Sequence, residues 1–148
     1  MHLGELCAAI AEYQLKRGRH FIVENPVRSE LYHMDHWVDL KRRYDLAVVR
    51  FHQCMTGLIG RKTGLPIQKH TEMWASDDRL LRRLASRQSH GRHQHVVLGY
   101  RYRRPGEPPP PSERPEEAQV WPRVFCKLLA EGCLDVLNAG GNRAAAAP

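Results

Sequence analysis

The stretch His20-Phe21-Ile22-Val23-Glu24-Asn25-Pro26 decides how the first half of this chain is interpreted. Its apolar residues predict a short buried strand over residues 20–23. Pro26 is expected to end the strand, because proline has no backbone N–H to donate and restricts Asn25 before it. The sequence therefore predicts a strand that places Glu24 and Asn25 at its end.

Helical and extended patterns alternate on both sides of this strand. Ser76 is expected to cap the last helix of the series, and a Gly-rich loop from Met55 to Gly64 precedes the last strand. Such alternation favours a mainly parallel sheet with helices packed on it. The predicted fold class is α/β, with a partial doubly wound sheet in an incomplete Rossmann-like unit. The expected elements are helices at 3–17, about 34–44 and about 77–88, and strands at 46–49 and about 67–75.

The composition changes sharply after residue 102. Residues 1–102 are expected to form the α/β module, and residues 103–118 a proline-rich linker around Pro108-Pro109-Pro110-Pro111. An SH3-type ligand is the sharper interpretation of that proline run, and a spacer the simpler one. Residues 119–138 predict an amphipathic helix, and residues 139–148 a disordered alanine-rich tail.

The chain is basic, with a net charge of +7 and a pI of 9.6. This balance favours a polyanionic partner such as DNA or RNA, although a basic solvated surface also explains it. No stretch reaches the length of a membrane span, and no secretory signal begins the chain, so a cytoplasmic or nuclear protein without a membrane partner is expected. The four cysteines show no CxxC pair, which favours free thiols.

Glu24 is the first candidate for chemistry. A carboxylate at the C-terminal end of a parallel strand lies where open α/β sheets bind their ligands. Partial burial there would raise its pKa and allow acid chemistry or a hydrogen bond to a ring nitrogen. The alternative is that Glu24 and Asn25 only satisfy a turn.

The order of the motifs resembles the middle of the cytosine-C5 DNA methyltransferase family over roughly residues 1–100. In that family a Glu-Asn-Val or Glu-Asn-Pro strand end precedes a Gly-x-Pro-Gln-x-Arg strand, and here Glu24-Asn25-Pro26 precedes Gly64-Leu65-Pro66-Ile67-Gln68-Lys69. The resemblance implies that Glu24 holds the target cytosine, that Asn25 is structural, and that Lys69 supports the base and the phosphate backbone. Lys69-His70-Thr71 replaces the expected Gln-x-Arg core.

Two motifs of that family are absent from the sequence. There is no Pro-Cys nucleophile loop and no Gly-rich turn for S-adenosylmethionine. Covalent methyl transfer needs both a nucleophile and a cofactor pocket. We therefore expect no catalysis by this chain alone, and S-adenosylmethionine as a cofactor only if upstream segments of a longer polyprotein complete the domain.

A second run of residues resembles an uncharacterised module of retrotransposon-type polyproteins, itself methyltransferase-like. The run begins with Gln14, Gly18, Arg19, Phe21, Glu24 and Pro26, continues through Gln53-Cys54-Met55, Gly57-Leu58, Lys69 and Thr71, and ends with His93, His95 and Trp121-Pro122. The resemblance implies a mobile-element origin and no particular activity. Such modules tend to carry a cysteine at the position of Ser89.

Histidines form a second candidate site before the apolar segment Val96-Val97-Leu98. His93 and His95 point to the same side of an extended segment, an acceptable spacing for two imidazoles on one Zn²⁺ ion. Cys54 could supply a thiolate from a neighbouring loop. The alternative is that these histidines are only solvent-exposed or contact phosphate.

Basic residues form the third candidate site. Arg79, Arg82 and Arg83 share one face of the predicted 77–88 helix, and Arg92 and Lys69 add to the positive charge. Such a stripe would contact phosphates without reading sequence, and a solvated helix face is the alternative.

The leading hypothesis combines these expectations. It is a methyltransferase-like fragment of a mobile-element polyprotein that binds nucleic acid and depends on upstream polyprotein segments for any catalysis. The alternatives are a small zinc-stabilised interaction module using Cys54, His93 and His95, or a degenerate inactive fragment.

Overall fold

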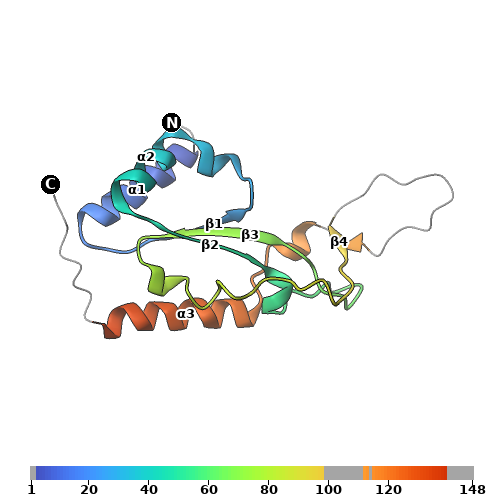
Figure 1. Ribbon diagram of the computed structural model, residues 1–148. Helices are drawn as coiled ribbons and strands as arrows, with labels where there is room; N and C mark the ends of the chain where they lie inside the picture. Colours follow the sequence, from blue (N-terminus) through green and yellow to red (C-terminus); the bar gives the residue numbers. More distant parts are fainter. Residues whose placement is uncertain (1–2, 99–111, 114, 140–148) are drawn as a thin grey trace.

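Three strands form an antiparallel sheet at the centre of the molecule (Figure 1). The computed structural model describes residues 3–98, 112–113 and 115–139. The sheet contains β1 (Ile22–Pro26), β2 (Ala47–His52) and β3 (His70–Ala75) in the order β1-β3-β2. Val23 and Val48 both lie opposite Trp74, so β3 is the central strand and the other two are its edges.

The predicted mainly parallel, doubly wound sheet is wrong. Because β3 is antiparallel to both neighbours, β1 and β2 run in the same direction and are joined through the helix between them. β3 lies between them, as in a split β-α-β arrangement. Alternating helices and strands identified the shared direction of β1 and β2, but they carried no information about which strand would lie between the two.

Two helices and a 3₁₀ turn cover one face of the sheet. They are α1 (Leu3–Lys16), η1 (Glu30–His33) and α2 (Asp35–Tyr44), close to the predicted helices at 3–17 and 34–44. Trp37 and Leu40 of α2 are 1% exposed and pack with Trp74 of β3. The stacked rings of Tyr32 and Trp74, 4.7 Å apart, extend this core to η1.

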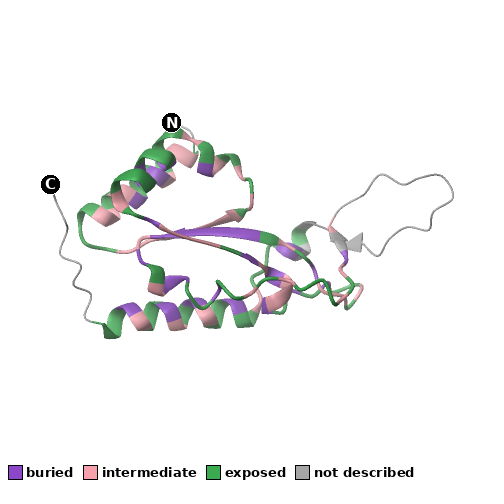
Figure 2. Ribbon diagram, in the orientation of Figure 1, coloured by how far each residue is buried: buried purple, intermediate pink, exposed green. Residues whose placement is uncertain are grey.

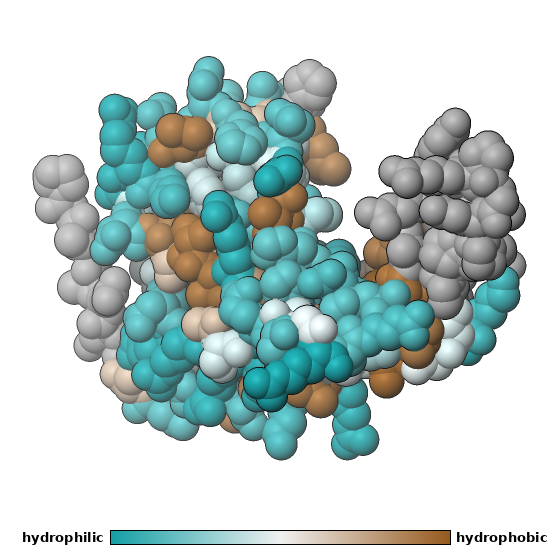
Figure 3. Space-filling model, turned by 45° about the vertical axis from the view of Figure 1, so that its right-hand side comes forward, coloured by the Kyte–Doolittle hydropathy of each residue, from teal (hydrophilic) through white to brown (hydrophobic). Residues whose placement is uncertain are grey.

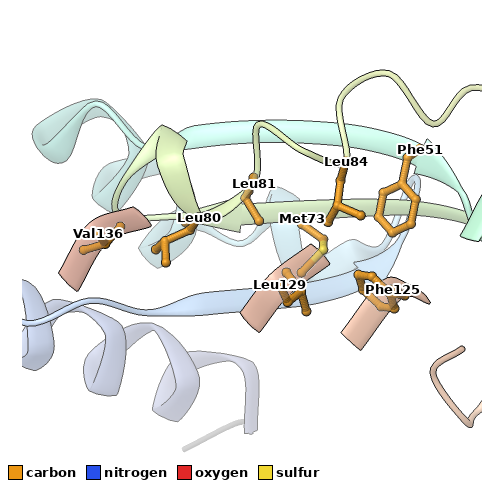
Figure 4. Packing of buried hydrophobic residues seen from close by; sticks show 9 residues of the cluster. Phe51, Met73, Leu80, Leu81, Leu84, Phe125, Leu129 and Val136 are labelled. Atoms are coloured by element: carbon orange, nitrogen blue, oxygen red, sulfur yellow. The ribbon is translucent and has the colours of Figure 1, made fainter. Parts of the chain in front are cut away.

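The other face of the sheet is covered by α3 (Arg123–Asn138) (Figures 1 and 4). Phe125 and Leu129 of α3 pack with Phe51 of β2 and Met73 of β3. The predicted helix at 119–138 is therefore part of the same core as the sheet. Since successive strand residues point to opposite faces, Met73 meets α3 while Trp74 meets α2.

The predicted helix at 77–88 is replaced by η3 (Asp78–Leu80) and a series of turns. Most backbone N–H groups here bond to the carbonyl three residues earlier, as Leu81 does to Asp78 and Leu84 to Leu81. Leu80, Leu81 and Leu84 are buried against α3 and the sheet. The apolar spacing that predicted an α-helix thus correctly marks the buried leucines, but the backbone forms 3₁₀-type turns instead of an α-helix.

Smaller elements complete the described chain. β4 (Val97–Leu98) pairs in parallel with β5 (Ser112–Glu113), and η4 (Pro115–Ala118) leads towards α3. β5 and η4 fall within the predicted 103–118 linker. The Pro108–Pro111 run and the predicted tail from residue 140 onwards lie outside the described residues. No helix among the described residues is long and apolar enough to cross a membrane.

Burial is concentrated on β3 and on the inner sides of the helices (Figure 2). The face shown in Figure 3 is mostly hydrophilic, with separate hydrophobic patches. Cys126 and Cys133 are exposed on α3, and all four cysteines are free.

Gly132 sets how closely α3 approaches η3. A Cβ atom at this position would lie 2.5 Å from the carbonyl oxygen of Leu80 and 3.0 Å from that of Arg79. We expect Gly132→Ala to lower the free energy of unfolding by about 1–3 kcal/mol, because the backbone must shift to admit the methyl group. Urea unfolding followed by circular dichroism measures this change.

Gly4→Ala is the matched control. Its Cβ would meet the flexible side chain of Met34 rather than backbone, and alanine favours the helix by about 1 kcal/mol. We expect a smaller loss than for Gly132→Ala, or a gain. Equal losses in the two variants would contradict the close backbone approach at Gly132.

Candidate metal centre

Cys54 lies in η2 (Gln53–Thr56), the 3₁₀ turn that follows β2 directly. Gln53 before it is fully buried and donates a hydrogen bond to Thr71 Oγ1 over 2.9 Å. Gly57 ends the turn with a φ of 91°, a conformation that glycine adopts without strain. These contacts fix η2 against the end of the sheet and give Cys54 a defined, half-buried position.

His93 and His95 lie on a segment without regular secondary structure. It begins near Gly91, which has a φ of 70°, and ends at Val96, whose N–H donates to Pro66 O over 2.9 Å. The two imidazole rings are 4.4 Å apart at their centroids and inclined by 66°. The bond from Val96 holds the segment beside the loop that follows η2.

Cys54, His93 and His95 come together, as the sequence predicted. One donor atom from each residue, the thiol sulfur or a ring nitrogen, lies within 4.8 Å of the other two. All three residues are half-buried. Thiolate and imidazole are the ligands that Zn²⁺ prefers in proteins, so the three residues could hold such an ion.

His93 Nε2 is buried and has no hydrogen-bond partner among the described residues. A buried polar atom without a partner is uncommon in folded proteins and calls for an explanation such as a bound ion. A metal bound through Nε2 would satisfy this nitrogen. This is the strongest observation of the site beyond the proximity of its residues.

Ser89 adjoins the group. Its hydroxyl is 3.5 Å from His95 Nε2 and hydrogen-bonds the Cys54 thiol. Ser89 N–H donates to Nδ1 of His52 over 3.0 Å. The serine is therefore close to two of the three candidate ligands, Cys54 and His95.

Burial shifts the pKa of two of the candidate ligands, Cys54 and His95. It raises the pKa of the Cys54 thiol, and the hydrogen bond with Ser89 partly offsets this effect. Burial, followed by the nearby charge on His93, lowers the pKa of His95. A lowered pKa favours the neutral imidazole, which is the form that binds metal.

His52 and His70 adjoin this group, and the sequence reasoning did not identify them. They face each other across β2 and β3, with their rings stacked 4.3 Å apart. Burial, then the charges on His70 and His95, lowers the pKa of His52. Only the register of the two strands brings these histidines together, and one sequence does not reveal that register.

Glu24 occupies a different place from the one predicted. It lies on edge strand β1 opposite Met73, and β1 pairs in antiparallel fashion with β3, so Glu24 does not lie at the expected end of a strand in a parallel sheet. Its carboxylate is 3.2 Å from Lys69 Nζ, and both side chains are largely buried, with 14% and 18% exposed. Asn25 Oδ1 accepts a 3.4 Å hydrogen bond from the Ser29 hydroxyl.

The predicted basic stripe is largely neutralised by carboxylates of the same chain. Arg79 forms a 2.6 Å ion pair with Asp77, while Arg82 and Arg83 both pair with Asp135 of α3 at 2.9 Å. Arg92 is exposed, and its backbone N–H donates to His90 Nδ1 over 3.1 Å.

Comparisons with known proteins place no further constraint on this site. The chain matches no protein family, no curated protein and no solved structure at a significant level. The predicted relation to methyltransferases and to mobile-element modules therefore stays a prediction.

The Glu24–Lys69 pair gives a test of what Glu24 does. We expect Lys69→Met to lower the free energy of unfolding by about 2 kcal/mol, because it leaves the Glu24 carboxylate largely buried without its cation. The double variant Glu24→Gln/Lys69→Met should lose less than the sum of the two single changes. Urea unfolding of the four proteins in this cycle measures the coupling.

Lys127→Met is the control for that cycle. Lys127 is 73% exposed and lies 3.8 Å from Glu131, so its loss should change the free energy of unfolding by less than about 0.5 kcal/mol. Strictly additive losses in the cycle would contradict a structural ion pair at Glu24.

Proposed function

We propose that this chain is a small zinc-stabilised module in which Cys54, His93 and His95 bind one Zn²⁺ ion. The observation that carries the proposal is the convergence of one donor atom from each of these residues, and the buried Nε2 of His93, which has no hydrogen-bond partner among the described residues, adds to it. Their chemistry supports zinc in particular, since one thiolate and two imidazoles make a mixed sulfur and nitrogen ligand set.

The spacing of the donors suits a site that closes around the ion. Tetrahedral zinc, with bonds of about 2.3 Å to sulfur and about 2.0 Å to nitrogen, holds its ligand atoms roughly 3.3–3.6 Å apart. The donors here lie within 4.8 Å of one another, so side-chain rotations suffice to reach that geometry. Zinc binding would replace the thiol proton of Cys54.

The ion would have a structural role. It would join η2, at the end of the sheet, to the 89–95 segment, which has no regular secondary structure of its own. An ion that binds the folded chain and not the unfolded one stabilises the fold by its binding free energy. Three protein ligands leave the fourth position to water or to the Ser89 hydroxyl, which lies 3.5 Å from His95 Nε2.

Metal content tests this proposal directly. Protein purified without chelator should contain one equivalent of zinc by elemental analysis, and Cys54→Ala, His93→Ala and His95→Ala should each lose it. Added zinc should raise the melting temperature of chelator-treated wild type, because it binds only the folded site, with a gain of about 2.7 kcal/mol at a hundredfold excess over Kd.

His36→Ala is the matched control, because His36 is exposed on α2 and is not among the three ligands. It should retain zinc and the zinc-dependent rise in melting temperature. Wild-type protein without zinc, or zinc retained by all three ligand variants, would overturn the proposal.

Ser89→Cys tests the geometry of the fourth position. A thiolate at residue 89 would complete a Cys₂His₂ set, and thiolates bind zinc far more strongly than hydroxyls do. We expect at least a tenfold lower Kd for zinc, about 1.4 kcal/mol, measured by competition with a chromophoric chelator. Ser86→Cys provides a control thiol outside the group, and an equal gain there would contradict the placement of residue 89.

A further inference from the structure

A second site lies on the face of the sheet that α1 and α2 cover, and none of its lining residues is a proposed zinc ligand. It is a cleft of about 1020 Å³ between the β1–η1 connection, α2 and the ends of β2 and β3. The arrangement of these elements can be followed in Figure 1. Its volume lies at the upper limit of the range typical of small-molecule sites, about 300–1,000 Å³.

The lining of the cleft is strongly positive. It contains four cationic side chains, those of Arg28, Lys41, Arg42 and Arg50, and a single carboxylate, that of Glu72. Of the four, Arg42 is paired with Asp39 by a 3.0 Å contact on the exposed side of α2. Arg28 and Lys41 have no carboxylate partner among the described residues.

The one carboxylate is already satisfied. Glu72 is 4% exposed, and its Oε2 accepts a 2.6 Å hydrogen bond from Arg50 Nε while its Oε1 accepts a 2.7 Å bond from Trp74 Nε1. Arg50 thereby uses one of its five N–H donors, and its side chain remains 61% exposed. Glu72 holds Arg50 in place, and most of the guanidinium donors remain available to a ligand.

Lys41 is held over the same floor. Its ammonium lies 4.9 Å from the centre of the Trp74 ring, a cation–π contact that keeps the charge within the cleft. Trp74 itself is 4% exposed and stacks on Tyr32, so the rings form a rigid floor rather than a surface on which a base could stack. The cleft is therefore suited to an anion more than to an aromatic ring.

Arg28 adds an independent indication. The Ser29 N–H bonds to Pro26 O over 3.0 Å, closing a four-residue turn with Arg28 as its third residue at a φ of 69°. Glycine is the residue favoured there, because a side chain at positive φ is strained. Strain of this kind is found most often where a side chain has a functional task.

We propose that this cleft binds the phosphate group of a phosphorylated ligand, with Arg28, Lys41 and Arg50 as its donors. Charge-assisted hydrogen bonds from guanidinium and ammonium groups are the strongest contacts a protein offers to phosphate. The phosphate could belong to a small phosphorylated molecule or to a polynucleotide backbone, and the probes below distinguish the two. The site is independent of the zinc proposal, since none of its donors is a zinc ligand.

Inorganic phosphate is the first probe, followed by the indole N–H resonances of ¹⁵N-labelled full-length protein. The Trp74 resonance should shift saturably with phosphate and not with sodium chloride at the same ionic strength. The Trp121 indole packs on Phe125 of α3, on the other face of the sheet, and should not move. A Trp74 resonance that does not shift, or one that shifts equally with chloride, would overturn the proposal.

A fluorescein-labelled single-stranded oligothymidylate is the second probe, measured by anisotropy at about 50 and 200 mM salt. Salt-sensitive binding that phosphate displaces would indicate a polynucleotide backbone. Phosphate binding at Trp74 without oligonucleotide binding would indicate a small ligand. Either result supports the phosphate site and shows which kind of ligand carries the phosphate.

Substitutions locate the donors. Lys41→Met and Arg28→Gly should each raise the Kd for phosphate about tenfold. Lys127→Met, which removes the same charge from α3, should leave the Kd unchanged. Arg28→Gly should also keep or raise the melting temperature, because glycine relieves the strained turn, so that weaker binding cannot be attributed to unfolding. Unchanged binding in both cleft variants, or an equal loss in Lys127→Met, would contradict the assignment.

Discussion

The antiparallel pairing of β3 with both of its neighbours is the constraint on which the rest of the structure depends. Five of the six residues of this strand are buried, so its N–H and C=O groups can be satisfied only by β1 and β2. The pairing also fixes which side chains face α3 and which face α2. Met73 and Trp74 are adjacent in sequence, yet they belong to two separate hydrophobic clusters on opposite faces of the sheet.

The same pairing divides the polar residues between the two faces. Glu24, opposite Met73, pairs with Lys69, whereas Arg50, opposite Glu72, lines the cleft beneath α2. A shift of β2 by one residue would move Arg50 into the hydrophobic cluster under α3 and Phe51 into the cleft. Phe51 is fully buried against Phe125, so this cluster opposes such a shift and thereby keeps Arg50 facing the cleft.

Much of the local structure could be predicted from the sequence, because local patterns carry that information. The expected helices at 3–17 and 34–44 and the strand at 46–49 agree with α1, α2 and β2 to within a few residues. Partner choice between strands is not local, so the mainly parallel sheet was wrong. A second limit of prediction from sequence is seen at Leu80, Leu81 and Leu84. Their helical spacing predicted that they are buried, but it did not predict the 3₁₀-type backbone that buries them.

The candidate sites show the same division between local and distant information. His93 and His95 are two residues apart, so their common side followed from an extended backbone, and the thiol of Cys54 was expected from a neighbouring loop. By contrast, Glu24–Lys69, His52–His70 and the Arg28–Lys41–Arg50 cleft each join segments whose contact depends on the register of β3. The arginines at i, i+3 and i+4 predicted a nucleic-acid surface, yet two of them, Arg82 and Arg83, form ion pairs with Asp135 of α3.

Free positive charge is therefore a better guide to a binding surface here than the number of basic residues. Arg82 and Arg83 pair with Asp135, and an anion would have to compete with that carboxylate to reach them. In the cleft, the single carboxylate of Glu72 is also bonded to Trp74, so it positions Arg50 without occupying the cation fully. Arg28 and Lys41 have no such partner among the described residues. A phosphate could pair with Arg28 and Lys41 without displacing an existing ion pair. This difference favours the cleft over the arginine stripe as an anion-binding site.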